Sequence, residues 1–319
     1  MIISASRRTD IPAFYSEWFF NRIEAGYVCV RNPVNSHRVS RIDLSPEVVD
    51  GIVFWTKNPI PMLSGLNAIR PYQYYFQFTL NSYGRDVEKN LPSKNDSIIP
   101  AFKELSRRIG PERVIWRYDP IMFTPKYTMD YHVTYFNEIA KRLSGYTEKC
   151  IISFLDFYRN TQNNTKNLGI LKMEEGQMRE LAQRFMAVAS QYHFVIESCA
   201  EEIDLEPFGI RHGHCVDCAL FESLIGYQLD IDKDKNQREH CGCVASIDIG
   251  AYNTCRNGCR YCYANHSLKA VESRTQAHDP LSPVLYGHIG PEDVVTDRKV
   301  HSSGNLQIKL RDLGECGKA

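Results

Sequence analysis

The sequence has no excess of charge of either sign and no long apolar run. Lysine plus arginine and aspartate plus glutamate each number 38, so the formal net charge is zero. A neutral chain has no electrostatic footprint for unspecific nucleic-acid binding, so charge does not support a nucleic-acid partner. The longest apolar runs, such as residues 150–155, are too short to cross a bilayer, and the first residues lack the apolar stretch of a secretory signal. We therefore expect a cytoplasmic protein with no membrane partner.

Several catalytic and nucleotide-binding motifs are also missing. No G-x-G-x-x-G follows a predicted strand, and the chain contains no G-x-x-x-x-G-K-[ST]. These absences exclude the dinucleotide fingerprint and the P-loop. The chain likewise has no H-E-x-x-H and no G-x-S-x-G, the patterns typical of zinc proteases and of serine hydrolases.

Cysteine is too sparse for a disulfide-stapled secreted domain, but it is unevenly placed. The chain has 11 cysteines. Most of them lie in the single stretch between residues 199 and 262: Cys199, Cys215, Cys218, Cys241, Cys243, Cys255, Cys259 and Cys262. In a reducing compartment, crowding of this kind indicates metal binding.

Short β-rich runs alternate with helical patterns along the chain. Most of these runs are continuously apolar, as expected for strands buried on both faces of a parallel sheet. The alternation predicts a βα-repeat α/β fold with one sheet, and without a dinucleotide fingerprint it favours a full or partial (β/α) barrel over a doubly wound sheet. The expected strands are residues 2–4, 27–30, 52–55, 74–80, 114–117, 150–155, 193–197 and 246–249.

Helix signals fill the intervals between these strands. Residues 129–143 and 173–192 have amphipathic patterns, and Ser16 is placed to cap a helix that Gly26 would end. The run Ser45-Pro46-Glu47 predicts the start of another helix, with a capping serine, a proline in the first position and an acid in the first turn.

Polar clusters follow several of the expected strands. In βα barrels the site lies at the carboxyl ends of the strands, so these clusters are expected to converge on one mouth. The alternative is that strand ends are polar simply because they become loops. The residues predicted to shape a substrate cavity are Arg7, Lys57, Asn58, Arg117 and Asp119.

Three of the cysteines form the pattern C-x3-C-x2-C: Cys255, Cys259 and Cys262. Three thiolates on one tight loop can hold three irons of a cubane cluster and leave the fourth iron open. The alternative is a zinc site in which His266 completes a tetrahedral set with the same three cysteines.

The other cysteines predict a second metal site. Cys199, Cys215, Cys241 and Cys243 are its candidate ligands, with Cys218 as an alternative fourth ligand. Spacing does not separate a second [4Fe–4S] cluster from zinc. If residues 244–249 were wholly a strand of about 20 Å, Cys243 would lie at the end opposite Cys255.

Residues 255–264, preceded by Ile249-Gly250-Ala251-Tyr252-Asn253, resemble the cluster loop of radical S-adenosylmethionine enzymes, and most closely that of the spore photoproduct lyase branch. The whole chain, from residues 4–12 through residues 55–59 to the final cysteines, also resembles the bacterial family called domain of unknown function 1848.

The first resemblance implies a [4Fe–4S] cluster on the three cysteines, with S-adenosylmethionine bound to the fourth iron. Reductive cleavage would then yield methionine and a 5′-deoxyadenosyl radical that abstracts hydrogen from an unknown substrate. It also implies a reducing partner such as a ferredoxin or flavodoxin, and it places Tyr261 where the family has an aromatic residue whose backbone meets the adenine. The lyase-like loop points by analogy to a nucleotide or nucleic-acid substrate.

In most of that superfamily the cluster loop follows the first strand, whereas here it follows the last. A circular permutation would make residues 246–249 the first barrel strand and residues 2–4 the second. The Gly-Gly-Glu stretch that many members use to bind the methionine amino group is absent. In the permuted register Arg8 and Asp10 are the candidates for contacting S-adenosylmethionine.

We expect three parts: a βα-repeat barrel over residues 1–198, a cysteine-rich segment with the last strand and cluster loop over 199–264, and a tail over 265–319 that packs on the barrel. The leading hypothesis is a radical S-adenosylmethionine enzyme. Two others stay open, a zinc-stapled barrel acting as a hydrolase or binding protein, and an iron–sulfur electron carrier or sensor that does not use S-adenosylmethionine.

Overall fold

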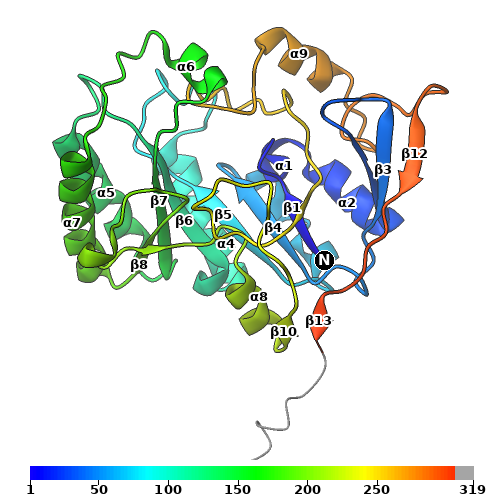
Figure 1. Cartoon of the computed structure of the whole chain (residues 1–319), viewed down its shortest axis with the longest axis horizontal. Helices are drawn as coiled ribbons and strands as arrows, with labels where there is room; N and C mark the ends of the chain where they lie inside the picture. The colour runs from blue at the N-terminus through cyan, green and yellow to red at the C-terminus, as the bar shows by residue number, and fades with distance from the viewer. Residues whose placement is uncertain (306–319) are drawn as a thin grey trace, which may run out of the picture.

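The computed structural model describes residues 1–305 of the 319-residue chain. Its main element is an eight-stranded sheet in which every neighbouring pair is parallel (Figure 1). This confirms an α/β fold with one large parallel sheet. The spatial order is β11 (Ile247–Asp248), β1 (Ile2–Ala5), β4 (Gly51–Thr56), β5 (Tyr74–Thr79), β6 (Val114–Ile121), β7 (Lys149–Phe154), β8 (Val195–Ser198) and β9 (Arg211–His212).

The strands β11 and β9 form the two edges of this sheet, and both are short. β11 covers only two residues of the predicted run 246–249, with Ile3 paired to Ile247 and Ser4 to Asp248. The backbone amide of Asp234 binds the carbonyl of Cys243, so residue 243 lies outside the sheet. Because β11 is this short, it does not carry Cys243 to the end of the sheet opposite Cys255.

A second, three-stranded sheet was not predicted. β2 (Tyr27–Arg31) and β3 (Arg38–Asp43) form an antiparallel hairpin, and β12 (Val294–Asp297) adds parallel to β3. The prediction that residues 27–30 belong to one common sheet is therefore wrong. In β3 only Val39 and Ile42 are buried, as expected for a strand with one solvated face. Two further short strands, β10 (Gln228–Leu229) and β13 (Gly304–Asn305), pair with each other.

The longest helices confirm the amphipathic patterns. α5 spans Met129–Leu143, with Thr128 as its N-cap, and α7 spans Glu175–Tyr192. Ser16 is the first residue of α2 rather than its cap. The other helices are α1 (Ile11–Phe14), α2 (Ser16–Ala25), α3 (Ile60–Leu63), α4 (Ile99–Ile109), α6 (Arg159–Thr165), α8 (Cys218–Ile225) and α9 (Leu268–Gln276), with short 3-10 or π turns at Leu66–Ile69, Lys94–Ile98, Pro111–Arg113 and Glu206–Phe208.

The helix predicted to start at Ser45 does not form. The backbone amide of Ser45 donates to the side chain of Asp43, and the carbonyl of Ser45 accepts from Val48 and Val49 in a single turn. β4 begins at Gly51, so the connection is too short for a helix to continue.

The two faces of the parallel sheet pack against different partners. Alternate strand residues such as Phe54, Phe76 and Trp116 join the large core beneath the helices. The residues between them, such as Val53 and Ile115, pack against the cysteine-rich segment. This alternation follows the two-residue period of a strand. The cysteine-rich segment therefore covers the sheet face that the helices leave free.

Residues 265–305 contact both α2 and the three-stranded sheet. Trp18 in α2 donates its indole N–H to the carbonyl of Ser282 at 2.9 Å, and β12 extends the small sheet. The expectation for residues 306–319 lies outside the described residues. Within the described part of the chain, no helix combines the length and hydropathy that a membrane span requires.

The packing of the helix-covered core predicts that a substitution inside it costs far more stability than one at an exposed site. Phe136 in α5 stacks on Phe185 in α7 at 3.9 Å between ring centroids, and both side chains are fully buried. Phe136→Ala should lower the free energy of unfolding by about 3–5 kcal/mol, measured by urea denaturation. Leu268→Ala, at a side chain that is 74% exposed, should change it by less than about 0.5 kcal/mol. Equal losses for the two variants would contradict this assignment of the core.

Candidate functional site

The carboxyl ends of the parallel strands line one large cavity of about 1390 Å³. Residues that follow β1, β4, β7 and β8, together with the last half of β6, contribute to its wall. The structure therefore brings together the polar clusters that the sequence places at separate strand ends. The predicted residues that line this cavity are Arg7, Arg8, Asp10, Lys57, Arg117, Asp119, Cys199, Cys215, Cys241, Cys243, Cys255, Cys259, Tyr261 and Cys262.

Two predicted site residues lie elsewhere. The side-chain oxygen of Asn58 accepts the backbone N–H of Ile60 at 3.2 Å, so Asn58 shapes the start of α3 instead of the cavity. Cys218 is the first residue of α8, where its thiol interacts with Glu222. Cys218 packs against the same apolar cluster as the other four candidate cysteines, but it is not among the residues that line the cavity.

The three-cysteine loop (residues 255–262) is held from several sides. The side-chain amide of Asn257 donates to Asp10 at 2.9 Å, and its carbonyl accepts from the backbone of Asn90 at 3.1 Å. Asn164 donates to the carbonyl of Cys262 at 2.8 Å. Gly258 lies at φ 68°, a left-handed conformation that glycine adopts without strain. These contacts fix the backbone from which the three thiols project.

The three cysteines are free and partly buried, and this desolvation raises the pKa of each thiol. The pKa of Cys259 rises to about 12, although the nearby ammonium of Lys57 opposes the shift. A metal or cluster that binds here must therefore displace the thiol protons. The donor set, three thiols on one loop beside a cavity, suits three irons of a cubane cluster.

Asp10 and Arg8 have different surroundings. The buried carboxylate of Asp10 accepts from Ala13, Thr56 and the backbone of Lys57 as well as from Asn257. Burial raises its pKa against these four hydrogen bonds. Asp10 thus joins the loop after β1, the end of β4 and the three-cysteine loop.

The guanidinium of Arg8 lies over the ring of Tyr252 at 5.0 Å and lines the cavity. Within the described residues, the guanidinium of Arg8 donates no hydrogen bond to the protein, whereas the carboxylate of Asp10 accepts four. Arg8 is therefore the better placed of the two to contact a bound molecule.

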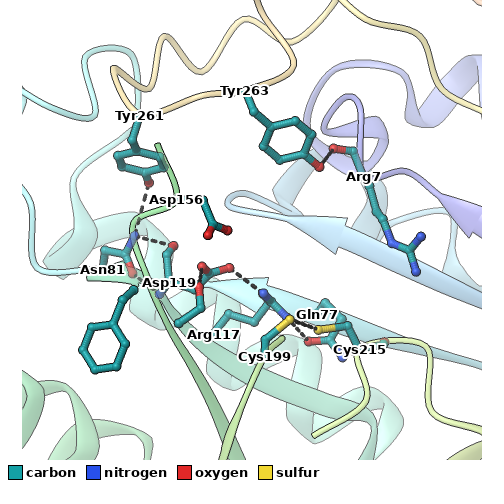
Figure 2. A network of polar contacts seen from close by, with 12 residues as sticks. Arg7, Gln77, Asn81, Arg117, Asp119, Asp156, Cys199, Cys215, Tyr261 and Tyr263 are labelled. Carbon is teal, nitrogen blue, oxygen red and sulfur yellow. Dashed lines mark hydrogen bonds and ion pairs between the residues drawn. The ribbon is translucent and has the colours of Figure 1, made fainter. Parts of the chain in front are cut away.

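The side chain of Tyr261 takes part in a buried ionic network. Its hydroxyl and the ammonium of Lys57, 2.7 Å apart, both bind the carboxylate of Glu88, which also pairs with Lys94. Burial alone would raise the pKa of Glu88, but the two lysines lower it to about 2. The side chain of Tyr261 thus anchors the three-cysteine loop to residues 84–94, and Figure 2 shows it near Asn81.

A four-cysteine group lies in the same cavity: Cys199, Cys215, Cys241 and Cys243. The sulfur atoms of Cys199 and Cys215 are 3.0 Å apart. Cys243 interacts in turn with both Cys215 and Cys241. Arg117 donates to the sulfur of Cys215 at 2.7 Å and pairs with Asp119 (Figure 2). Within residues 1–305, no group of three or more His, Cys, Asp or Glu side chains is already arranged around a single metal position.

Sequence reasoning missed two anchors of the cavity. Asp248 accepts from the hydroxyl of Ser6 at 2.6 Å and from the backbone of Arg7 at 2.9 Å, which ties β11 to the loop after β1. A charged residue between two isoleucines of an expected strand was the available signal. Glu88 follows no strand and belongs to no motif, so the sequence offered no signal for it.

The fold and the cavity define an α/β protein with a parallel sheet and a cysteine-rich cavity at the carboxyl ends of its strands. The chain belongs to the family described as domain of unknown function DUF1848, whose model matches residues 2–264. This confirms the family resemblance seen in the sequence. No curated protein matches the chain.

Among solved structures, the chain is similar to a "putative alpha-L-fucosidase" from Bacteroides thetaiotaomicron, with a TM-score of 0.24 and 13% identity. That match covers 50% of this chain and 66% of the other.

The Glu88 network predicts an acid-dependent loss of stability. Because the pKa of Glu88 falls from 4.5 to about 2 on folding, its carboxylate stabilises the fold above about pH 4.5. That stability is lost as the pH falls toward 2. Glu88→Gln should lower the free energy of unfolding at pH 7 by about 3 kcal/mol and flatten its dependence between pH 4.5 and 2. Urea denaturation across this pH range measures both effects. Glu175→Gln, which removes the acid of an exposed ion pair, is the control. If the free energy of unfolding of Glu88→Gln depended on pH as strongly as that of the wild type, the assignment would be contradicted.

Proposed function

We propose that this protein is a radical S-adenosylmethionine enzyme whose catalytic [4Fe–4S] cluster is held by Cys255, Cys259 and Cys262. One observation carries the proposal: three free thiols spaced C-x3-C-x2-C line a large cavity at the carboxyl ends of parallel strands. When bound, the cluster would supply the electron that cleaves S-adenosylmethionine reductively. The reductant would be a ferredoxin or flavodoxin, and the substrate is a molecule still to be identified.

The size of the cavity supports this proposal. At about 1390 Å³ it exceeds the roughly 300–1,000 Å³ of ordinary small-molecule pockets. It therefore has space for a cofactor and a second reactant together. Radical chemistry needs both molecules in one enclosed space, because water and oxygen would otherwise intercept the reactive species.

We further infer that the sheet is a partial (β/α) barrel, permuted so that β11 corresponds to a first strand. Two features support this inference. β11 lies parallel to β1 at one edge, and from β1 to β9 the spatial order follows the chain order. In that register the three-cysteine loop follows a first strand, as in the radical S-adenosylmethionine enzymes that its sequence resembles.

The chain's own residues would prepare this site in distinct ways. Burial raises the pKa of the Cys259 thiol, and the nearby ammonium of Lys57 acts in the opposite direction. The ammonium of Lys57 would therefore stabilise a ligating thiolate at Cys259. Asp10 would act as a positioning residue, since its carboxylate already holds Asn257 of the three-cysteine loop. Arg8 does not hold the loop in this way. We propose that its guanidinium, which lines the cavity, contacts the carboxylate of S-adenosylmethionine.

The cluster assignment predicts a spectroscopic signature. Protein purified without oxygen and reduced with dithionite should give the EPR signal of a reduced [4Fe–4S] cluster, and S-adenosylmethionine should change its shape. Cys259→Ala should abolish the signal from this cluster and remove about four irons per chain. Cys29→Ala, at a buried cysteine of β2 outside the cavity, should leave both unchanged.

Two outcomes of that experiment would overturn the proposal. A cluster signal that S-adenosylmethionine leaves unchanged would indicate an electron carrier or sensor. A colourless, EPR-silent protein loaded only with zinc would indicate that the cysteines are structural.

The role of Arg8 predicts a loss of cofactor affinity. Arg8→Ala should weaken S-adenosylmethionine binding roughly tenfold or more, because a charge-assisted hydrogen bond is lost, and calorimetry on the cluster-loaded protein measures this. Arg298→Ala removes the same charge from another part of the cavity wall and should have a smaller effect. Equal weakening by the two variants would indicate general electrostatic attraction instead of a specific contact.

A further inference from the structure

The four-cysteine group is built from three separate segments of the chain. Cys199 directly follows β8, Cys215 lies shortly after β9, and Cys241 and Cys243 precede β11. Each of these four residues is less than one tenth exposed. Figure 2 shows Cys199 and Cys215 beside Arg117, with Tyr261 and Tyr263, the neighbours of Cys262, on the far side of the drawn network. The group is thus a second thiol cluster, distinct from the three-cysteine loop.

Backbone contacts hold two of these segments against each other. The amide of Val244 donates to the carbonyl of Val216 at 3.1 Å, and the amide of Val216 donates to the sulfur of Cys243 at 3.3 Å. Amide donors to sulfur are a common feature around ligating cysteines, because they stabilise the thiolate form.

Positive charge surrounds the group. Arg117, whose side chain is 6% exposed, donates to Cys215, and Arg238 donates to the carbonyl of Cys199 at 3.5 Å. Arg7 lies nearby, and its Nη2 atom is buried without a hydrogen-bond partner among the described residues. Each of these arginines also pairs with an acid: Arg117 with Asp119, Arg238 with Asp156 and Arg7 with Asp234 at 3.6 Å. The N–H donor that Arg117 directs at the sulfur of Cys215 would stabilise a ligating thiolate.

We propose that Cys199, Cys215, Cys241 and Cys243 form a tetrathiolate metal centre, which takes a zinc ion or an iron–sulfur cluster. Each thiol gives up its proton when the metal binds. Zinc–sulfur bonds of about 2.3 Å would set the sulfur atoms about 3.8 Å apart, so Cys199 and Cys215 must separate slightly from 3.0 Å. Cys218, on α8, is not a ligand.

This centre has a structural consequence for the sheet. β9 and β11 are its two unpaired edges, and the ligands come from the segments beside both of them. A metal bound here would cross-link the two edges across the inner face of the sheet. It would also complete the packing of that face, where residues such as Val53 and Ile115 contact the cysteine-rich segment.

Metal analysis of the full chain purified without oxygen tests the proposal. Cys243→Ser should lose about one zinc, or the iron and acid-labile sulfide of one cluster, relative to wild type. Cys218→Ser is the matched control and should keep the full content. Zinc or additional iron supports the centre and identifies its metal, whereas equal metal content in Cys243→Ser and wild type overturns it.

A second measurement uses the unaltered protein and does not depend on how well the variants fold. Alkylation of native protein, read by mass spectrometry, should modify the four cysteines much faster after treatment with a strong chelator, and the chelator should lower the melting temperature. Unchanged reactivity, or a Cys199–Cys215 disulfide in the oxygen-free protein, would overturn the proposal.

The two proposals fail separately. Cys259→Ala should remove the cluster of the three-cysteine loop and leave the metal of the four-cysteine group in place. Cys243→Ser should do the reverse. Loss of metal only in Cys259→Ala would leave the proposed function standing and overturn the tetrathiolate centre.

Discussion

The parallel pairing of β11 with β1 is the contact on which the arrangement of the cavity depends. It returns the chain, after more than two hundred residues, to the edge of the strand where it began, with Ser4 opposite Asp248. The carboxylate of Asp248 then binds the loop that follows β1. Because two parallel strands end at the same edge, residues 6–10 and the three-cysteine loop leave the sheet side by side. This pairing adds to the contacts through which Asp10, Asn90 and Asn164 hold the loop.

Buried charge makes the wall of the cavity rigid. An ionised group is costly away from water unless it is paired and hydrogen-bonded. Asp119 pairs with Arg117, Glu88 pairs with two lysines, and Asp10 accepts four hydrogen bonds. Glu88 and Asp10 connect segments that are distant in sequence, and Asp119 on β6 also binds the hydroxyl of Ser153 on β7, so a change in one segment would break a contact in another. The cavity is therefore formed before any ligand enters it, which lowers the free-energy cost of ordering a bound molecule.

Local patterns were sufficient to predict much of this arrangement. Residues 129–143 carry a complete helix signal, and the C-x3-C-x2-C spacing places three thiols on one loop whatever the surrounding fold. Contacts between segments that are distant in sequence could not be predicted in the same way. Residues 27–30 have strand composition, but only their pairing with β3 excludes them from the main sheet. The role of Glu88 depends on lysines at positions 57 and 94, a coincidence in space that no local pattern encodes.

The two cysteine groups differ in the number of thiols that each contains, and this difference separates the roles that we propose for them. Three thiols leave one coordination position open toward the cavity, whereas four close the coordination of a metal. The open set lies on a loop held by Asp10 and Asn164, while the closed set lies on the inner face of the sheet between its edges. The parallel sheet has two edge strands, β11 and β9, and the proposed metal centre would join them. Reactivity at the three-cysteine loop would then depend on the sheet geometry that the four-cysteine group stabilises.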